Sequence, residues 1–363
     1  MSEQMGRVRL NQKQAAVVLL LPFLCAYFAF LIYPFLRGIW ISLHDWNLLA
    51  VAFNPDAKEF VGLKNYVRVM WGKDITWSVS HSPILQSAAT VGAIVALWAK
   101  STYRMRASFA WPVILICAVL FIASGFHPSD GGRWYDRRFW PIVINTITFV
   151  GVTVPCVTGV ALILAAALNR ETRSMAILRT LFFLSNVLSV TVVTLIWQIM
   201  FSPRQGLIAN VMDVFDRSPI VWLTDVQFAM LAVVITTVWW SLGIAMILFL
   251  AGLQDISNDL YEAGALDNAT GVKAFWFITL PNLKRTITLV VVLQIILHFQ
   301  VFGQVHLMTN GGPNDSTQVL VRYIYQTGFR DSELGRAAAM AVFLFVIMSA
   351  LSLVQFMIGR EQE

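Results

Sequence analysis

The sequence has little charge for its length. Of its 363 residues only 13% are charged, whereas 58% are apolar. A soluble domain carries about a quarter charged residues, and a disordered chain is rich in charge and poor in apolar residues. Both classes are therefore excluded, and the composition indicates an integral membrane protein.

Catalytic and metal-binding motifs are also missing. The three cysteines, Cys25, Cys117 and Cys156, fall inside apolar runs without metal-type spacing, and the five histidines are scattered. There is no phosphate-binding loop, no H-E-x-x-H and no G-x-S-x-G nucleophile motif. The sequence predicts a chain that is not an enzyme and holds no metal or cofactor of its own.

The net charge of +6 does not indicate nucleic-acid binding. The basic residues form short clusters beside apolar runs, as membrane-orientation signals do. A helix needs about 20 mainly apolar residues to cross a bilayer. Eight runs come near this length: Ala15–Leu36, Pro83–Trp98, Ser108–Phe126, Trp140–Leu168, Ile177–Phe201, Val226–Leu253, Thr286–His306 and Arg336–Ile358.

The sequence thus predicts an all-α polytopic membrane protein with about eight transmembrane helices. Pro83–Trp98 is the weakest run, because it is short and contains Gln86, Ser87 and Thr90. It is also compatible with a re-entrant segment or a soluble piece packed outside the membrane.

Three basic residues, Arg7, Arg9 and Lys13, precede the first run. This run is longer than a signal-peptide core and no A-x-A site follows it, which indicates an uncleaved anchor. Residues 1–14 are then cytoplasmic, and so is the tail at 359–363. Residues 37–139 form an extracytoplasmic segment with an inserted hairpin at about 83–126, and 140–358 form a core domain. Basic residues divide equally between the two sides, but the inner loops are shorter, which favours this orientation.

The predicted inner loop Gln254–Arg285 carries its own helix signals. Asp259 and Glu262 fit a capping box, and Asn268 and Gly271 tolerate the left-handed backbone that ends a helix. A second amphipathic piece leads into Pro281. The loop predicts two short helices on the inner face of the membrane, and these residues alone are equally compatible with an ordinary capped surface loop.

The residues Glu262-Ala263-Gly264-Ala265-Leu266-Asp267-Asn268-Ala269, followed by Ile278-Thr279-Leu280-Pro281, resemble the EAA loop of the permease subunits of binding-protein-dependent ABC importers. The family pattern is E-A-A-x-x-x-D-G-A, followed by I-x-L-P. Gly264 replaces an alanine, and Asn268 replaces a glycine. Since Asn is the next best residue where φ is positive, the turn is compatible with this change.

Two further segments resemble the carbohydrate branch of these permeases, of the maltose and glycerol-phosphate type. One comprises 307–313, 321–326, Phe329 and 335–339, and the other comprises Tyr33-Pro34, Ser42, Asp45-Trp46 and 60–66. Related permeases lack most of Gly72–Arg138, which we interpret as an extra helical hairpin added to a six-helix core.

The resemblance implies an ATP-driven sugar importer in the inner membrane of a prokaryote. Its implied partners are a homologous second permease, two cytoplasmic ATPases that bind ATP and Mg, and an extracytoplasmic solute-binding protein. It places the EAA loop in the cytoplasm. The residues implied to couple to an ATPase are Glu262, Ala263, Gly264, Asp267 and Asn268.

Polar residues in the seventh run suggest a solute path. On a straight helix Gln294, His298, Gln300 and Gln304 fall within one arc of about 160°. Either a water-filled path or a hydrogen-bonded helix seam explains such a stripe. The resemblance implies solute contacts at Leu297 and His298, and also at Ser202 and Gly206, although the latter pair equally fits an ordinary exit turn.

Amide and imidazole groups without an obligate charge favour a neutral carbohydrate. The alternative function is a secondary transporter driven by an ion gradient, which usually carries intramembrane carboxylates. The eight runs contain no Asp and no interior Glu, which counts against it. A membrane-embedded enzyme would need a catalytic constellation that the sequence does not show.

Overall fold

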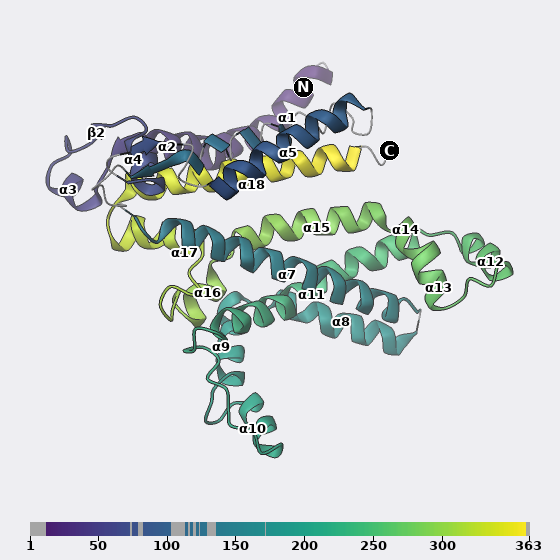
Figure 1. Cartoon of the computed structure of the whole chain (residues 1–363). Helices are drawn as coiled ribbons and strands as arrows, with labels where there is room; N and C mark the ends of the chain where they lie inside the picture. The colour runs from purple at the N-terminus through teal and green to yellow at the C-terminus, as the bar shows by residue number, and fades with distance from the viewer. Residues whose placement is uncertain are drawn as a thin grey trace, which may run out of the picture.

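The computed structural model describes residues 12–72, 75–78, 83–102, 136–170 and 172–360, with short stretches at 113–114, 117–118, 121–122 and 124–128. These residues are mostly α-helical, and their strands form two small two-stranded sheets. Figure 1 shows long helices running side by side, with α12 (Asn258–Leu266) projecting beyond one end of the bundle. The predicted all-α fold is confirmed.

The first span runs through three joined pieces, α1 (Gln12–Tyr27), the π-helical η1 (Phe28–Ile32) and α2 (Tyr33–Ser42). The stretch Leu19–Ser42 is long and apolar enough to cross a membrane. Leu19 is 79% exposed and Phe30 is 84% exposed, so this helix presents apolar side chains outward as a lipid-facing helix does. It extends six residues beyond the predicted end at Leu36.

A short region follows in which β1 (His44–Asp45) pairs antiparallel with β2 (Glu59–Phe60). Between them lies α3 (Leu48–Phe53), whose N-cap Asn47 accepts hydrogen bonds from two backbone amides. The next helix, α4 (Lys64–Met70), packs against the last helix of the chain, α18 (Leu334–Arg360).

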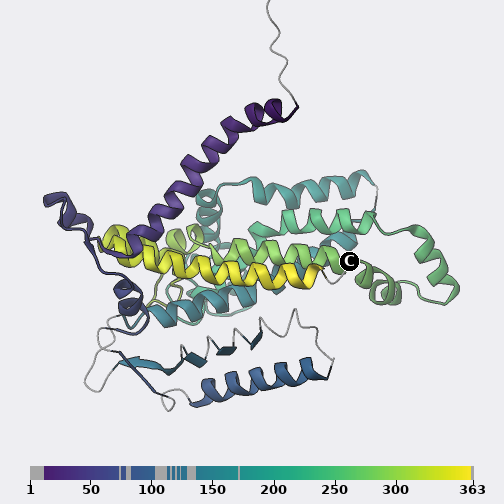
Figure 2. The same cartoon turned by 90° about the horizontal axis from the view of Figure 1, so that it is seen from above.

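The insertion begins and ends at a second pair of strands. β3 (Ile75–Trp77) pairs antiparallel with β4 (Phe126–Pro128). Between them, α5 (Pro83–Ser101) is long and apolar enough to span a membrane, and Figure 2 shows it at the edge of the molecule. The weakest of the predicted runs is therefore a helix, whereas most of the run Ser108–Phe126 lies outside the described residues.

The core is built from α7 (Phe139–Leu168), α11 (Ala229–Gln254), α15 (Lys284–Phe299) and α18. Ala161 and Ala165 of α7 and Ala245 of α11 are completely buried in one cluster. Small side chains let helix backbones approach closely, which is the usual basis of packing between membrane helices.

Two pairs of consecutive helices meet at sharp bends. The fifth run divides into α8 (Arg173–Val187) and α9 (Val190–Met200), which meet at 103°, and Ser189 caps the second piece. At the end of the predicted inner loop, α13 (Val272–Ala274), η2 (Phe275–Thr279) and α14 (Leu280–Asn282) lead into α15, the helix of the seventh run, at an angle of 69°. Over the described residues, five helices are able to cross a membrane, or up to seven if each bent pair is one span.

The remaining helices are short. α10 (Leu207–Val214) follows α9, and α16 (Gly303–Met308) follows α15. Then α17 (Leu320–Tyr325) and the π-helical η3 (Gln326–Arg330) lead into α18.

Candidate functional site

The loop between α11 and α15 folds as a short helical hairpin. Ser257 caps α12 by accepting a hydrogen bond from the amide of Asp259 at 3.3 Å. The predicted capping box, which begins the helix at Asp259, is therefore wrong. Serine is an equally good N-cap, and because Ser257 lies two residues earlier, Asp259 falls inside the first turn of α12. The predicted positive φ of Asn268 is confirmed, at 58° directly after the C-cap of α12, whereas Gly271, with φ 54° and ψ −120°, does not end this helix but is the N-cap of α13.

The two arms of this hairpin are in direct contact. The hydroxyls of Tyr261 and Thr279 lie 2.9 Å apart. A Cβ atom built on Gly264 would overlap the Cδ1 methyl of Ile278. The isoleucine therefore fills the space that a methyl group would need at Gly264, which gives a physical reason for glycine at this position.

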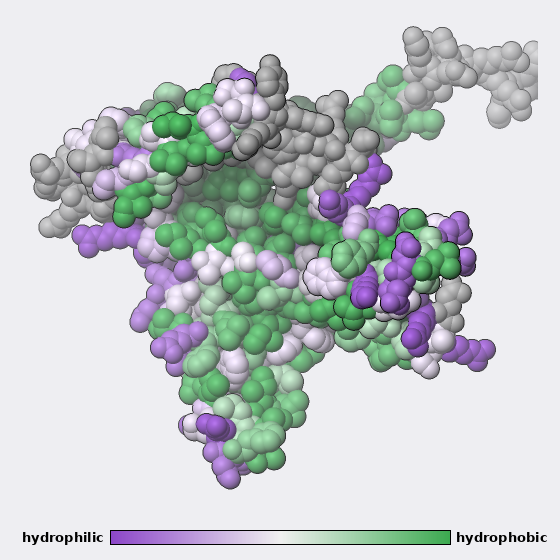
Figure 3. Space-filling view, turned by 45° about the vertical axis from the view of Figure 1, so that its right-hand side comes forward, coloured by the Kyte–Doolittle hydropathy of each residue, from purple (hydrophilic) through white to green (hydrophobic). Residues whose placement is uncertain are grey.

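The outer surface of the hairpin is both charged and apolar. Glu262, Ala263, Asp267 and Asn268 are exposed, while Gly264 is partly buried. Large apolar side chains lie beside them: Leu260, Leu266, Val272, Trp276 and Phe277, of which Leu266 is 91% exposed. We call these exposed residues together the loop surface. In Figure 3, which brings this end forward, green and purple side chains mix on the part that projects at the right.

Four of the seven expected solute-path residues line a groove of about 500 Å³ between α11, α15 and α16. Leu297, His298, Gln300 and Gln304 line this groove, whereas Gln294 does not. Because α15 ends at Phe299, the continuous polar stripe predicted for this run is wrong, and Gln304 belongs to the separate α16. The turn between the helices nevertheless brings the four residues to one groove.

Burial divides these side chains into two groups. Gln294 and His298 are almost fully buried, and the His298 Nδ1 atom lies 2.7 Å from the carbonyl of Gln294. The His298 Nε2 atom is 3.4 Å from the hydroxyl of Ser241. Leu297 is 57% exposed and Gln300 is exposed, and the Gln300 amide nitrogen lies 3.9 Å from the sulfur of Met348 on α18.

The remaining polar lining was not foreseen. Asn186, Thr237, Trp240 and Ser241 complete the groove. Asn186 donates to the carbonyl of Trp240 at 3.1 Å, and the Trp240 indole donates to the carbonyl of Leu188 at 3.1 Å. These bonds tie the bend between α8 and α9 to α11. The available signal was the polar sequence Asn186-Val-Leu-Ser189, which interrupts an apolar run.

Ser202 and Gly206 do not line this groove. They form a tight turn after α9, in which the Gly206 amide donates to the Ser202 carbonyl at 2.9 Å. A Cβ atom on Gly206 would come 2.5 Å from the carbonyl oxygen of Met200. Glycine is required by this turn itself, and contact of the pair with solute stays a prediction.

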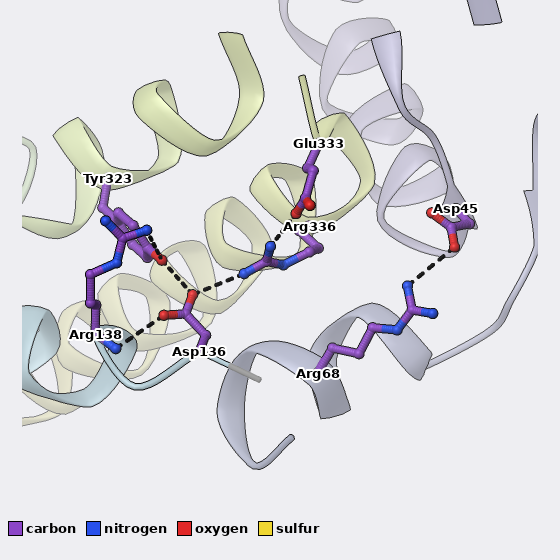
Figure 4. A network of polar contacts seen from close by, with 7 residues as sticks. All are labelled: Asp45, Arg68, Asp136, Arg138, Tyr323, Glu333 and Arg336. Carbon is purple, nitrogen blue, oxygen red and sulfur yellow. Dashed lines mark hydrogen bonds and ion pairs between the residues drawn. The ribbon is translucent and has the colours of Figure 1, made fainter. Parts of the chain in front are cut away.

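A buried polar network lies where α7 begins, and sequence reasoning missed it. Asp136 accepts hydrogen bonds from the Tyr323 hydroxyl at 2.5 Å and from Arg336 at 3.0 Å, and Arg336 also pairs with Glu333. Figure 4 shows these side chains converging from the loop before α7, from α17 and from the beginning of α18. Burial is the main cause that raises the pKa of Tyr323, and the hydrogen bond to Asp136 adds to it.

In the same region, the motif residues near the first span contact the motif residues at 335–339. Asn65 donates to the carbonyls of Ser42 at 2.9 Å and His44 at 2.8 Å. Gly335 approaches so closely that a Cβ atom there would overlap the His44 carbonyl oxygen. These motif residues hold the first span against α18, so their role in the structure is packing.

The Gly-Gly-Pro loop surrounds a buried arginine. Arg322 donates to Gln318 at 2.5 Å, to Gln326 at 2.9 Å and to Asn310 at 2.7 Å. Gly311, at φ 80°, lies so close that a Cβ atom would overlap the Gln318 amide. Burial is the main cause that lowers the pKa of Arg322, followed by the charge of Arg330.

The sequence also matches the model of a known protein family. The family model described as "binding-protein-dependent transport system inner membrane component" matches residues 137–362, which is more than half of the chain. The chain belongs to this family. The matched region begins beside Asp136 and contains the helical hairpin of the loop surface, the groove and the Gly-Gly-Pro loop.

Individual relatives of this permease are transport proteins. It is 36% identical over 224 residues to the sn-glycerol-3-phosphate transport system permease protein UgpA of Agrobacterium fabrum, covering 61% of this chain and 75% of that one. It is 26% identical over 358 residues to the trehalose/maltose transport system permease protein MalF of Thermococcus litoralis, covering 98% and 97%.

A solved structure shares the fold of this permease. It belongs to a bacterial ABC transporter involved in the import of the acidic polysaccharide alginate, with a TM-score of 0.64 and 19% identity. The match covers 96% of this chain and 95% of the other.

Proposed function

We propose that this chain is the permease subunit of an ATP-driven sugar importer and forms half of its translocation path. The loop surface carries the proposal. Leu266, Trp276 and Phe277 are large apolar side chains left exposed at one end of the bundle, with Glu262 and Asp267 beside them. Contiguous apolar surface with a charged rim is typical of a protein interface.

The partner at the loop surface is a cytoplasmic ATPase, of which the complete importer contains two copies. Those subunits bind ATP and Mg, and this chain binds neither. Glu262, Ala263, Asp267 and Asn268 lie on the exposed side of α12 and its end, whereas Gly264 faces Ile278 and joins the two arms of the hairpin. Closure of the ATPases moves the hairpin. For this movement to be transmitted, the contacts of the hairpin must differ between the outward-open and inward-open states of the importer.

The solute passes beside the groove of α11, α15 and α16. Its lining residues include Gln300 and Gln304, which carry amides, and the aromatic residues Trp240 and Phe302. Sugars present hydroxyls and flat apolar faces, so paired amides and aromatic rings suit them. No carboxylate, Lys or Arg lines the groove among the described residues, which favours a neutral carbohydrate over a phosphorylated one.

The importer is completed by a homologous second permease and an extracytoplasmic solute-binding protein. Residues 1–14 and 359–363 are cytoplasmic, and residues 37–139 lie outside, in the inner membrane of a prokaryote. This orientation places the loop surface in the cytoplasm, where ATP is present. It places the polar network around Asp136 at the outer end of the bundle.

Co-purification tests the proposal. The chain should be isolated with the other subunits, and the complex should hydrolyse ATP in response to the loaded binding protein. Disrupting Ala263–Asp267 should abolish this coupling while the permease remains folded. An ion-gradient-driven transporter is the alternative, and full solute uptake by this chain alone in ATP-free vesicles would establish it instead.

A further inference from the structure

A second groove, of about 350 Å³, lies between α8 and α11 at the end that carries the loop surface. Its polar lining consists of Arg179, Thr180 and Gln254. Gln254 is the last residue of α11, directly before the turn into α12. The apolar lining is formed by Phe183, Ile247 and Leu250. The groove therefore has a polar end and an apolar floor.

Arg179 supplies the positive charge at this polar end. Its side chain is half-buried and makes one hydrogen bond, from Nε to the carbonyl of Met175 at 3.4 Å. Over the described part of the chain, Arg179 forms no ion pair. A guanidinium keeps its charge in a protein and presents a fork of donors that matches phosphate oxygens. An anion with several oxygens is the ligand that this end of the groove fits.

The surroundings of the groove are lipid-facing. Ile177, Leu181 and Leu184 of α8 are each more than half exposed, and α8 belongs to a bent pair apolar enough to span a membrane. Ile247, on the facing side of α11, is 41% exposed. A molecule bound at Arg179 would thus continue from a polar head into apolar surroundings along the same two helices.

We propose that this groove binds an anionic phospholipid of the inner leaflet. The phosphate lies at Arg179 and Gln254, and an acyl chain follows Phe183, Ile247 and Leu250 into the bilayer. Basic pockets between membrane helices on the cytoplasmic side are suited to such headgroups. The charge complementarity of Arg179 and the apolar floor together select an amphiphilic anion, because a free phosphate ion would leave the floor unused.

The proposal does not depend on the transported solute, since lipid binding requires neither ATP nor sugar. The full chain, purified in a mild detergent and stripped of lipid, is titrated with phosphatidylglycerol and analysed by native mass spectrometry. We expect binding of one lipid. Arg179→Gln should weaken it about fivefold, as expected for one interfacial arginine.

Two matched controls isolate the groove. Arg173→Gln removes the same charge from the same helix at an exposed position outside the groove, and it should change binding less than twofold. Ala251→Phe fills the groove without changing charge and should abolish binding, whereas Ala176→Phe on the exposed side of α8 should not. Thermal unfolding of each variant checks that it remains folded.

Three results would overturn the proposal. Equal losses for Arg179→Gln and Arg173→Gln would indicate general surface attraction. Equal affinity for phosphatidylcholine would remove the role of the anionic headgroup. Displacement of the lipid by millimolar inorganic phosphate, with Ala251→Phe still binding, would assign a simple anion site without an acyl-chain floor.

Discussion

The Tyr323 hydroxyl donates a 2.5 Å hydrogen bond to Asp136, which lies 187 residues earlier in the chain. The same Asp136 oxygen accepts from Arg336, so one carboxylate joins the start of α7 to α17 and α18. Asp136 is 5% exposed and Tyr323 is 1% exposed. A buried carboxylate is costly unless it is paired, and these partners provide the pairing.

Replacing this tyrosine should destabilise the permease. Tyr323→Phe keeps the ring but removes one of the two side-chain hydrogen bonds that this Asp136 oxygen accepts, and we expect a loss of about 1–3 kcal/mol. Thermal unfolding of the detergent-purified chain measures it. Tyr325→Phe is the control, because Tyr325 is 37% exposed. Equal stability of the two variants would contradict a structural role of the hydrogen bond.

Alkaline pH should remove the same contribution. Burial and the hydrogen bond to Asp136 raise the pKa of Tyr323, so its neutral form is favoured in the folded state. The stabilisation is complete below the unfolded pKa of about 10 and is lost as the pH rises above it. The difference in melting temperature between wild type and Tyr323→Phe should therefore shrink between about pH 10 and about pH 12. A constant difference over that range would refute this linkage.

Gly264 should tolerate alanine only at a cost. A new Cβ atom meets Ile278 Cδ1, the end of a flexible side chain, so Gly264→Ala should reduce coupled ATP hydrolysis through overpacking of about 1–3 kcal/mol. Ile278→Val removes the conflicting methyl, and the double variant should recover most of the activity. Additive losses in the double variant would show that the two side chains do not compete for this space.

Leu266 should contribute to partner binding and little to folding. Leu266→Ser alters a side chain that is 91% exposed, so the melting temperature of the isolated chain should stay unchanged. If the ATPase buries this side chain, the change should cost about 1.5–3 kcal/mol of affinity. Surface plasmon resonance against the ATPase measures it, with Val214→Ser, at an 80% exposed position on α10, as the control. Unchanged affinity would place the partner elsewhere.

The groove predicts a difference between two glutamines. Gln300 is exposed and lines the groove, so Gln300→Leu should weaken solute uptake about 2–10-fold through one lost hydrogen bond. Gln294 is buried outside the groove lining, and its Oε1 atom has no hydrogen-bond partner among the described residues. Gln294→Leu should therefore leave the KM of uptake unchanged. The reverse order of effects would move the path to the other side of α15.

The helical segments and the turn residues of the loop were predictable from local signals. Apolar runs indicate where helices form. Asn268 was predictable as a turn residue because asparagine is one of the few residues that tolerate a positive φ. The bend at Ser189 was missed because apolar residues lie on both sides of it, although serine is a good N-cap. The stripe of Gln300 and Gln304 was misjudged because a straight helix was assumed beyond Phe299.

The polar network was beyond local reasoning. Asp136 is separated from Tyr323 by 187 residues and from Arg336 by 200 residues, and no spacing rule connects them. The same holds for Gly264 and Ile278, whose contact depends on how two short helices fold back on each other. Such pairs follow from tertiary packing, which one sequence does not reveal.

The strand pair β3–β4 places the two ends of the insertion side by side, with Ile75 opposite Pro128 and Trp77 opposite Phe126. Trp77 and Phe126, which flank the segment that contains α5, are therefore neighbours in the structure. We expect this segment to tolerate a change in length, because the paired strands close its base. This region of the permease is therefore the natural place for grafting a fluorescent domain or an affinity tag without disturbing the rest of the molecule.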